Sequence, residues 1–199
     1  MAKSPALVRV VIAYLIFILT QYATWVAVLV YAYGHGGVTA AGLVAVAQLL
    51  PSAVAAPLFA TAVDRRSPTV LLTAGYVAQG LGCAAVAATI YADALPPLVY
   101  VAAIVTSMAF TATRPAQAAL VPGLARDLEE LTATNVLVGW VESVAIVLAG
   151  VGGGLLMTWD GAAPVAAVSA VLLAGATLLV IRLPTPTLGA GDDVGSAFQ

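Results

Sequence analysis

The stretch VVIAYLIFILTQYATWVAVLVYAY, residues 10–33, decides the fold of this chain. It carries no charged side chain, and a helix needs about 20 apolar residues to cross the core of a bilayer. Lys3 and Arg9 precede it, as basic residues precede the apolar part of a secretory signal peptide. However, the run is too long for such a peptide and has no convincing cleavage site. It therefore predicts a first transmembrane helix.

Segments of the same kind follow along the whole chain. The six expected spans are residues 7–33, 40–63, 69–91, 95–121, 134–159 and 164–183. The chain has 62% hydrophobic and 8% charged residues, whereas soluble domains carry about 25% charged residues. Such a chain cannot cover a globule with polar surface, so its surroundings must be a lipid bilayer. The predicted fold class is all-α, a polytopic membrane protein with six transmembrane helices.

Basic residues fall on one side of this predicted topology. Alternating the connections places the following residues on the same side: Lys3, Arg9, Arg65, Arg66, Arg126 and Arg182. The opposite connections contain no lysine or arginine. Because cytoplasmic loops carry the excess of basic residues, both termini are expected in the cytoplasm, with the protein in the inner or plasma membrane.

The composition also argues against several classes of function. A net charge of −2 gives no reason to expect nucleic acid as a partner. Cys83 and His35 are single residues of their type, so an internal disulfide, a multi-cysteine metal site or a bound cofactor is not expected. The sequence contains no recognisable Ser/His/Asp set and no pair of carboxylates suited to catalysis, so the chain is not expected to be an enzyme.

The chain divides into a helical bundle, residues 1–184, and a tail, residues 185–199. The tail is rich in small, polar and acidic residues, which is typical of a flexible linker. We expect this linker to be cytoplasmic and to lead from a first half into a larger protein.

Polar side chains within the expected spans gather on the first, fourth and fifth. They are Tyr14, Gln21 and Trp25, then Tyr100, Ser107, Thr111 and Arg114, and then Asn135, Gly139, Glu142 and Gly153. The second span adds Gln48, whereas the sixth has only Ser169 and Thr177 and can therefore face lipid. Gln21 and Gln48 either form ordinary interhelical hydrogen bonds or line a pathway.

Two charged residues lie well inside the spans. A charge at the centre of a helix costs about 2.5–3.5 kcal/mol on insertion scales, so it usually faces the bundle interior or a wet cavity. Arg114 and Glu142 have equal expected depth on consecutive helices, which predicts an ion pair between them. Such a pair either has a structural role, as a latch, or allows Glu142 to titrate during transport.

Two groups of glycines predict close helix packing. Gly150, Gly153 and Gly154 lie in the run AGVGGG of the fifth span, which allows another helix to approach closely. Glycines at 75, 80 and 82 indicate the same on a smaller scale in the third span.

Five short segments, in the right order, resemble the N-terminal half of a major facilitator superfamily transporter. They are Thr20–Trp25, Leu43–Pro51 (especially Gln48–Pro51), Ala60–Arg66, Arg114–Pro122 followed by Ala133–Asn135, and Ala149–Gly154. The first is similar to an S-Q-x-G-D-W segment, the third to a G-x-L-x-D-R-x-G-R loop and the fifth to the antiporter sequence G-P-x-x-G-G. The resemblance is to the branch that contains macrolide-efflux proteins and siderophore exporters.

This resemblance implies two inverted three-helix repeats, completed by a second six-helix half or a dimer mate. It implies an exporter of a small-molecule substrate, coupled to protons as an antiporter and working by alternating access. The candidate residues for the cavity or for coupling are Gln21, Thr24, Gln48, Arg114 and Glu142. Asp64 and Arg65 form the expected conformational loop.

The chain departs from the family pattern at several positions. Thr24 stands where exporters of this branch often have a membrane aspartate, and Gly150 replaces the proline of the antiporter sequence. Ser67 and Pro68 replace a glycine and an arginine of the charged loop. The missing carboxylate at Thr24 and the altered charged loop fit one alternative, a six-helix membrane partner or scaffold without transport activity. Another alternative, the membrane domain of an ABC transporter, usually has helices that extend farther into the cytoplasm than these short loops allow.

Overall fold

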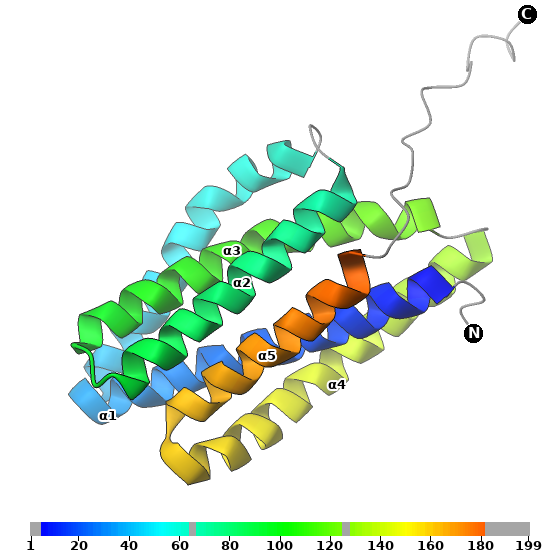
Figure 1. Ribbon diagram of the computed structural model, residues 1–199. Coiled ribbons are helices and arrows are strands. Elements are labelled where there is room, and N and C mark those ends of the chain that lie inside the picture. Colours follow the sequence, from blue (N-terminus) through cyan, green and yellow to red (C-terminus); the bar gives the residue numbers. More distant parts are fainter. Residues whose placement is uncertain (1–4, 64–66, 125–127, 182–199) are drawn as a thin grey trace, which may run out of the picture.

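The computed structural model describes residues 5–63, 67–124 and 128–181, and this part of the chain is helical (Figure 1). The helices are α1 (Pro5–Val63), α2 (Pro68–Tyr91), α3 (Pro96–Leu124), α4 (Leu128–Asp160) and α5 (Ala162–Ile181). All five are long and apolar enough to cross a membrane. The fold class is therefore all-α, as the composition predicts.

The longest helix, α1, is interrupted inside the expected first turn. Gly36 and Gly37 have non-helical backbone angles, and φ of Gly37 is +65°, a conformation that favours glycine. In Figure 1 the chain turns back at this break, so α1 consists of two arms, residues 5–35 and 38–63. We refer to this end of the bundle as the Gly36 end and to the other as the Pro5 end.

The remaining described turns lie where the sequence predicts them. Prolines open α2 and α3, in the first helical turn, where a proline is tolerated because its missing N–H has no helical partner. The turn after α2 includes Asp93 with φ +47°, and Gly161 with φ +65° separates α4 from α5. Both turns lie at the Gly36 end (Figure 1).

One boundary differs from the prediction. The fifth span is expected to begin at residue 134, but α4 begins at Leu128 and α3 continues to Leu124. Glu129 therefore lies in the first turn of α4, where a carboxylate interacts favourably with the positive end of the helix dipole. Charge alone suggests a connection here, but the same charges are compatible with a helix start.

The centre of the bundle is built around α1 and α2. The first arm of α1 packs with α3, α4 and α5, while α2 lies between α3 and α5. Phe17 stacks on Phe110 with a centroid distance of 4.8 Å and contacts Tyr76 at 5.4 Å. This aromatic group joins α1, α2 and α3 in the largest buried cluster.

Glycines of α2 bring its neighbours close. A Cβ atom added to Gly75 would lie 2.1 Å from Oγ1 of Thr113, and one added to Gly82 would lie 2.3 Å from Oγ1 of Thr106. Gly80 faces Leu173 of α5 on the other side. The packing interpretation of these glycines is therefore confirmed.

The two last helices differ from expectation in their exposure. The expected sixth span is only partly free to face lipid, because one face of α5 packs on α1 and α2 and buries Ser169 and Thr177. By contrast, α4 is largely exposed and makes little contact with α3. The space between α3 and α4 is where the candidate site lies.

Candidate functional site

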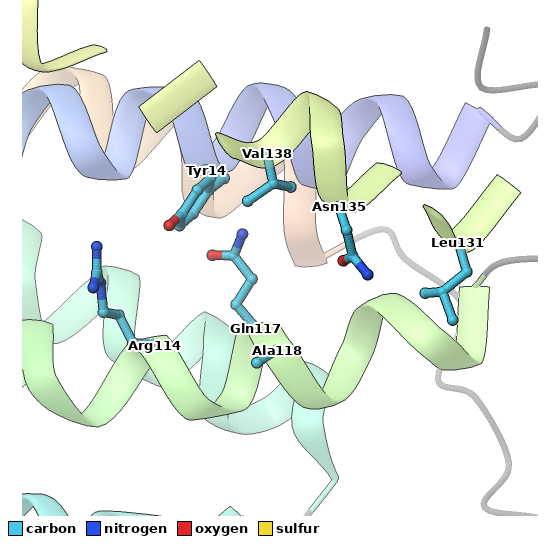
Figure 2. A pocket seen from close by; sticks show the side chains of 7 residues that line it. All are labelled: Tyr14, Arg114, Gln117, Ala118, Leu131, Asn135 and Val138. Carbon is cyan, nitrogen blue, oxygen red and sulfur yellow. The ribbon is translucent and has the colours of Figure 1, made fainter. Parts of the chain in front are cut away.

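A cavity of about 400 Å³ lies between α3 and α4, with the first arm of α1 behind it (Figure 2). Its walls are formed by Tyr14, Arg114, Gln117, Ala118, Leu131, Asn135 and Val138. In Figure 2 the side chains of Arg114 and Gln117 rise from α3 toward Tyr14, while Asn135 and Leu131 point from α4 toward α3. Polar groups therefore converge from three segments on a space that apolar side chains also border.

An ion pair spans the two helices at this cavity. The guanidinium of Arg114 donates to a carboxylate oxygen of Glu142, as equal depth on consecutive helices predicts. The two side chains keep 44% and 31% of their surface exposed. A charge at membrane depth requires a protein partner or a wet cavity, so this exposure indicates a face that does not contact lipid.

An aromatic platform supports the arginine. The guanidinium carbon of Arg114 lies 5.3 Å from the centroid of the Phe110 ring, within the range of a cation–π interaction. Phe110 in turn rests on Phe17, and Tyr14 stacks on Phe17 at 6.1 Å. The charged group is thus held over the buried core instead of extending freely from it.

Gln117 is the buried polar group of this cavity. Its side chain is only 4% exposed, and its Oε1 atom has no hydrogen-bond partner. Leaving a buried acceptor without a partner costs about 1–3 kcal/mol. Because the residue lies one helical turn beyond Arg114, both side chains emerge on the same face of α3.

The other candidate residues form contacts between helices. Nε2 of Gln79 donates to Oε1 of Gln21 at 3.3 Å, which links α2 to α1. Oγ of Ser107 donates to Oε1 of Gln48 at 3.1 Å, which links α3 to the second arm of α1. Neither Gln21 nor Gln48 lines the cavity between α3 and α4.

Thr24 also lies at a helix interface. Its hydroxyl donates to Oγ of Ser169 at 3.1 Å and lies 3.7 Å from the sulfur of Cys83. The residue is 5% exposed and joins α1 to α5 and α2. The position at which related exporters often carry an aspartate is therefore a buried hydroxyl contact in this chain.

The glycines of α4 divide into two groups. Gly153 packs against Ala23, since an added Cβ atom would lie 3.6 Å from the Cβ of that alanine. Gly150 and Gly154 face open space within the described part of the chain. Asp64 and Arg65, the expected conformational loop, lie outside the described residues.

Three of the polar cavity residues are not among the site candidates that the sequence predicts. Tyr14 and Asn135 lie on the polar faces it identified, and Gln117 follows Arg114 by three positions, which is the spacing of a shared helix face. Within residues 5–63, 67–124 and 128–181, no group of three His, Cys, Asp or Glu residues lies together that could hold a metal ion.

The fold and the site together define a multi-pass membrane protein with a charged pair beside a cavity. Residues 10–196 match the sequence family described as the Major Facilitator Superfamily, and the chain belongs to this family. Its members are membrane transporters of small molecules, not enzymes. A comparison with curated proteins gave no match.

Proposed function

We propose that this chain is the N-terminal half of a secondary active transporter that exports small molecules in exchange for protons by alternating access. The observation that carries the proposal is the Arg114–Glu142 ion pair beside a cavity of about 400 Å³. Arg114 lines this cavity, and carboxylates within membrane-spanning helices often belong to proton relays. Family membership supports transport by such a chain.

In this proposal each arm of α1 crosses the membrane separately. The break at Gly36 and Gly37 then gives six spans, which two inverted three-helix repeats would arrange around a shared pathway. Both ends of the bundle segment would lie in the cytoplasm, and the protein would reside in the inner or plasma membrane. The one-sided distribution of lysine and arginine supports this orientation.

A second six-helix half or a dimer mate would cover the open face of the cavity. The exposed ion pair and the open glycines Gly150 and Gly154 favour this part of the proposal, because lipid is a poor neighbour for charges and glycines permit close approach of a helix. Gln21, Thr24 and Gln48 would connect movements of the helices through their interhelical hydrogen bonds. Asp64 and Arg65 would steady the cytoplasmic end of the second span against the partner half.

The test is solute-dependent proton movement in vesicles that contain the complete transporter. Vesicles loaded with a pH-sensitive dye are given a pH gradient and a panel of neutral, anionic and cationic small molecules. We expect at least one solute to release protons in the wild type and Glu142→Gln to abolish this release. Asp160→Asn, which also replaces a carboxylate by an amide but at the end of α4, should retain the proton release.

A folding defect must be separated from a loss of proton transfer. The double variant Arg114→Gln with Glu142→Gln leaves no unpaired charge, so it should be produced in normal amounts and still lack proton release. Proton release by the folded double variant would contradict the coupling role of Glu142. Absence of flux for every solute with the wild type would instead favour a membrane partner without transport activity.

A further inference from the structure

The amide of Gln117 is a feature that packing does not explain. Only 4% of its surface is exposed, it lines the cavity, and its Oε1 atom has no hydrogen-bond partner. Figure 2 shows the amide directed into the space between Tyr14 of α1 and Val138 of α4. A leucine of similar size would fill the same position without a buried polar atom. An acceptor kept at this cost is available to a ligand that donates a hydrogen bond.

The charges at the cavity are already balanced. Arg114 is paired with Glu142, so an anionic ligand would have to displace the carboxylate, and a cationic ligand would have to displace the guanidinium. The other polar side chains at the wall, Tyr14 and Asn135, are uncharged. A ligand without net charge is therefore the one that the site accommodates with its ion pair intact.

Apolar side chains supply the rest of the surface. Leu131 and Val138 of α4 face the same space as the amide of Gln117. Ala118 borders this space from α3. The volume of about 400 Å³ lies near the lower end of the range for pockets that hold drug-sized molecules. The cavity is thus suited to a small molecule with one hydrogen-bonding end and an apolar body.

We propose that this cavity binds an uncharged amphiphilic small molecule that donates a hydrogen bond to Gln117 and packs its apolar part against Leu131 and Val138. This inference rests on the proposed function, since it specifies the class of substrate for the same cavity. It assigns to Gln117 a role in selecting the ligand. Arg114 and Glu142 remain an ion pair without net charge while the ligand binds.

Protection of a cysteine at the cavity wall tests the inference. Ala118→Cys is introduced into the full chain, in which Cys83 is buried and serves as the unreactive background. Modification by a maleimide is measured with four probes on one skeleton: 2-(2-naphthyl)ethanol, its methyl ether, 2-naphthylacetate and 2-naphthylethylammonium. We expect the alcohol to protect at about three- to tenfold lower concentration than each of the others, the ratio that one neutral hydrogen bond provides.

Three variants assign the preference to the amide. Gln117→Leu should remove the advantage of the alcohol over the ether while leaving the thermal unfolding midpoint unchanged or raised, because no bonded partner is lost. Gln117→Asn, which withdraws the amide by one methylene, should reduce the advantage. Gln79→Leu is the matched control, since it breaks the bond to Gln21, lowers the midpoint and retains the preference.

Several results would overturn the inference. These are an unchanged preference in Gln117→Leu, strongest protection by either charged probe, or a lowered midpoint of Gln117→Leu, which would indicate a structural amide. The proposed function fails separately. Selective protection without gradient-driven flux rejects transport and retains the ligand class, whereas flux together with equal protection by all four probes rejects the ligand class alone.

Discussion

Arg114 has three different neighbours, each of which reduces the cost of its charge. Glu142 supplies the opposite charge, the ring of Phe110 supplies a cation–π contact, and the cavity gives access to water. A lysine could form the ion pair, but it would place a compact, strongly hydrated ammonium near the ring instead of the delocalised guanidinium. The residue type thus suits a charge that must stay at membrane depth.

Removal of one partner should show how strongly the pair contributes. Glu142→Gln leaves Arg114 without a counter-charge, so the stability of the bundle in detergent should fall by about 1–3 kcal/mol, between the values for exposed and buried pairs. The double variant with Arg114→Gln should recover more than half of this loss. Thermal unfolding of the single and double variants measures the coupling. Equal stability of Glu142→Gln and the wild type would show that the pair contributes nothing to the fold.

At the scale of the helix, α2 is the most tightly enclosed element. Its glycines allow α3 to approach on one side and α5 on the other, with Thr113 and Thr106 seated against Gly75 and Gly82. Helix α4, in contrast, contacts α3 mainly through the ion pair, and an added Cβ atom would meet open space at four of its five glycines. The same residue type therefore has opposite consequences on the two helices.

Alanine substitution should distinguish these two kinds of glycine. Gly75→Ala and Gly82→Ala place a Cβ atom into a threonine side chain, so each should destabilise the bundle by about 1–3 kcal/mol. Adding Thr113→Ala to Gly75→Ala should restore part of the loss. Gly150→Ala meets open space and should raise stability by up to about 1 kcal/mol, the gain in helix propensity. Similar unfolding midpoints for all three glycine variants would contradict this assignment.

Helix positions could be predicted from the sequence because the length and hydropathy of a span are set by the bilayer and not by its neighbours. The Arg114–Glu142 pair could be predicted from depth alone, since two helices joined by a short connection place equal depths side by side. The partners of Gln21 and Thr24 could not. Which side chains meet across a helix interface depends on rotation about the helix axis and on how closely the backbones approach.

The candidate site shows the same limit. Polar residues on one face indicated which helices carry the site, but the cavity depends on the weak contact between α3 and α4, which no residue pattern encodes. The start of α4 at Leu128 shows a related ambiguity, since acidic residues mark both loops and first helical turns.

At the scale of the whole molecule, the described turns lie at one end of the bundle. Gly36, Asp93 and Gly161 lie at one end, while the first residues of α1 and α4 lie at the other (Figure 1). Because α1 and α4 begin at the same end, the chain must cross the membrane an even number of times before α4. This condition is met only if each arm of α1 crosses separately, followed by α2 and α3. The distribution of lysine and arginine is the argument for the proposed orientation, with the Pro5 end in the cytoplasm.

Cysteine labelling tests this topology in intact cells. A membrane-impermeant maleimide added from outside should modify Gly36→Cys and Asp160→Cys fully and leave Glu129→Cys unmodified until the cells are opened. These positions are all exposed, so burial does not decide the result. The reverse pattern would invert the orientation, and labelling of Gly36→Cys together with Glu129→Cys would rule out separate crossings by the two arms of α1.

The hydrogen bond between Thr24 and Ser169 also orders events during synthesis. Its two residues are 145 positions apart, whereas Gln21 meets Gln79 after 58 positions. The link between α1 and α2 can therefore form as soon as α2 has left the ribosome, whereas the hydrogen bond of Thr24 to Ser169 can form only after α5 has been made. A nascent chain stalled before α5 exposes the seat of that helix on α1 and α2 to lipid. Insertion of α5 is thus the step that covers this face of α1 and α2.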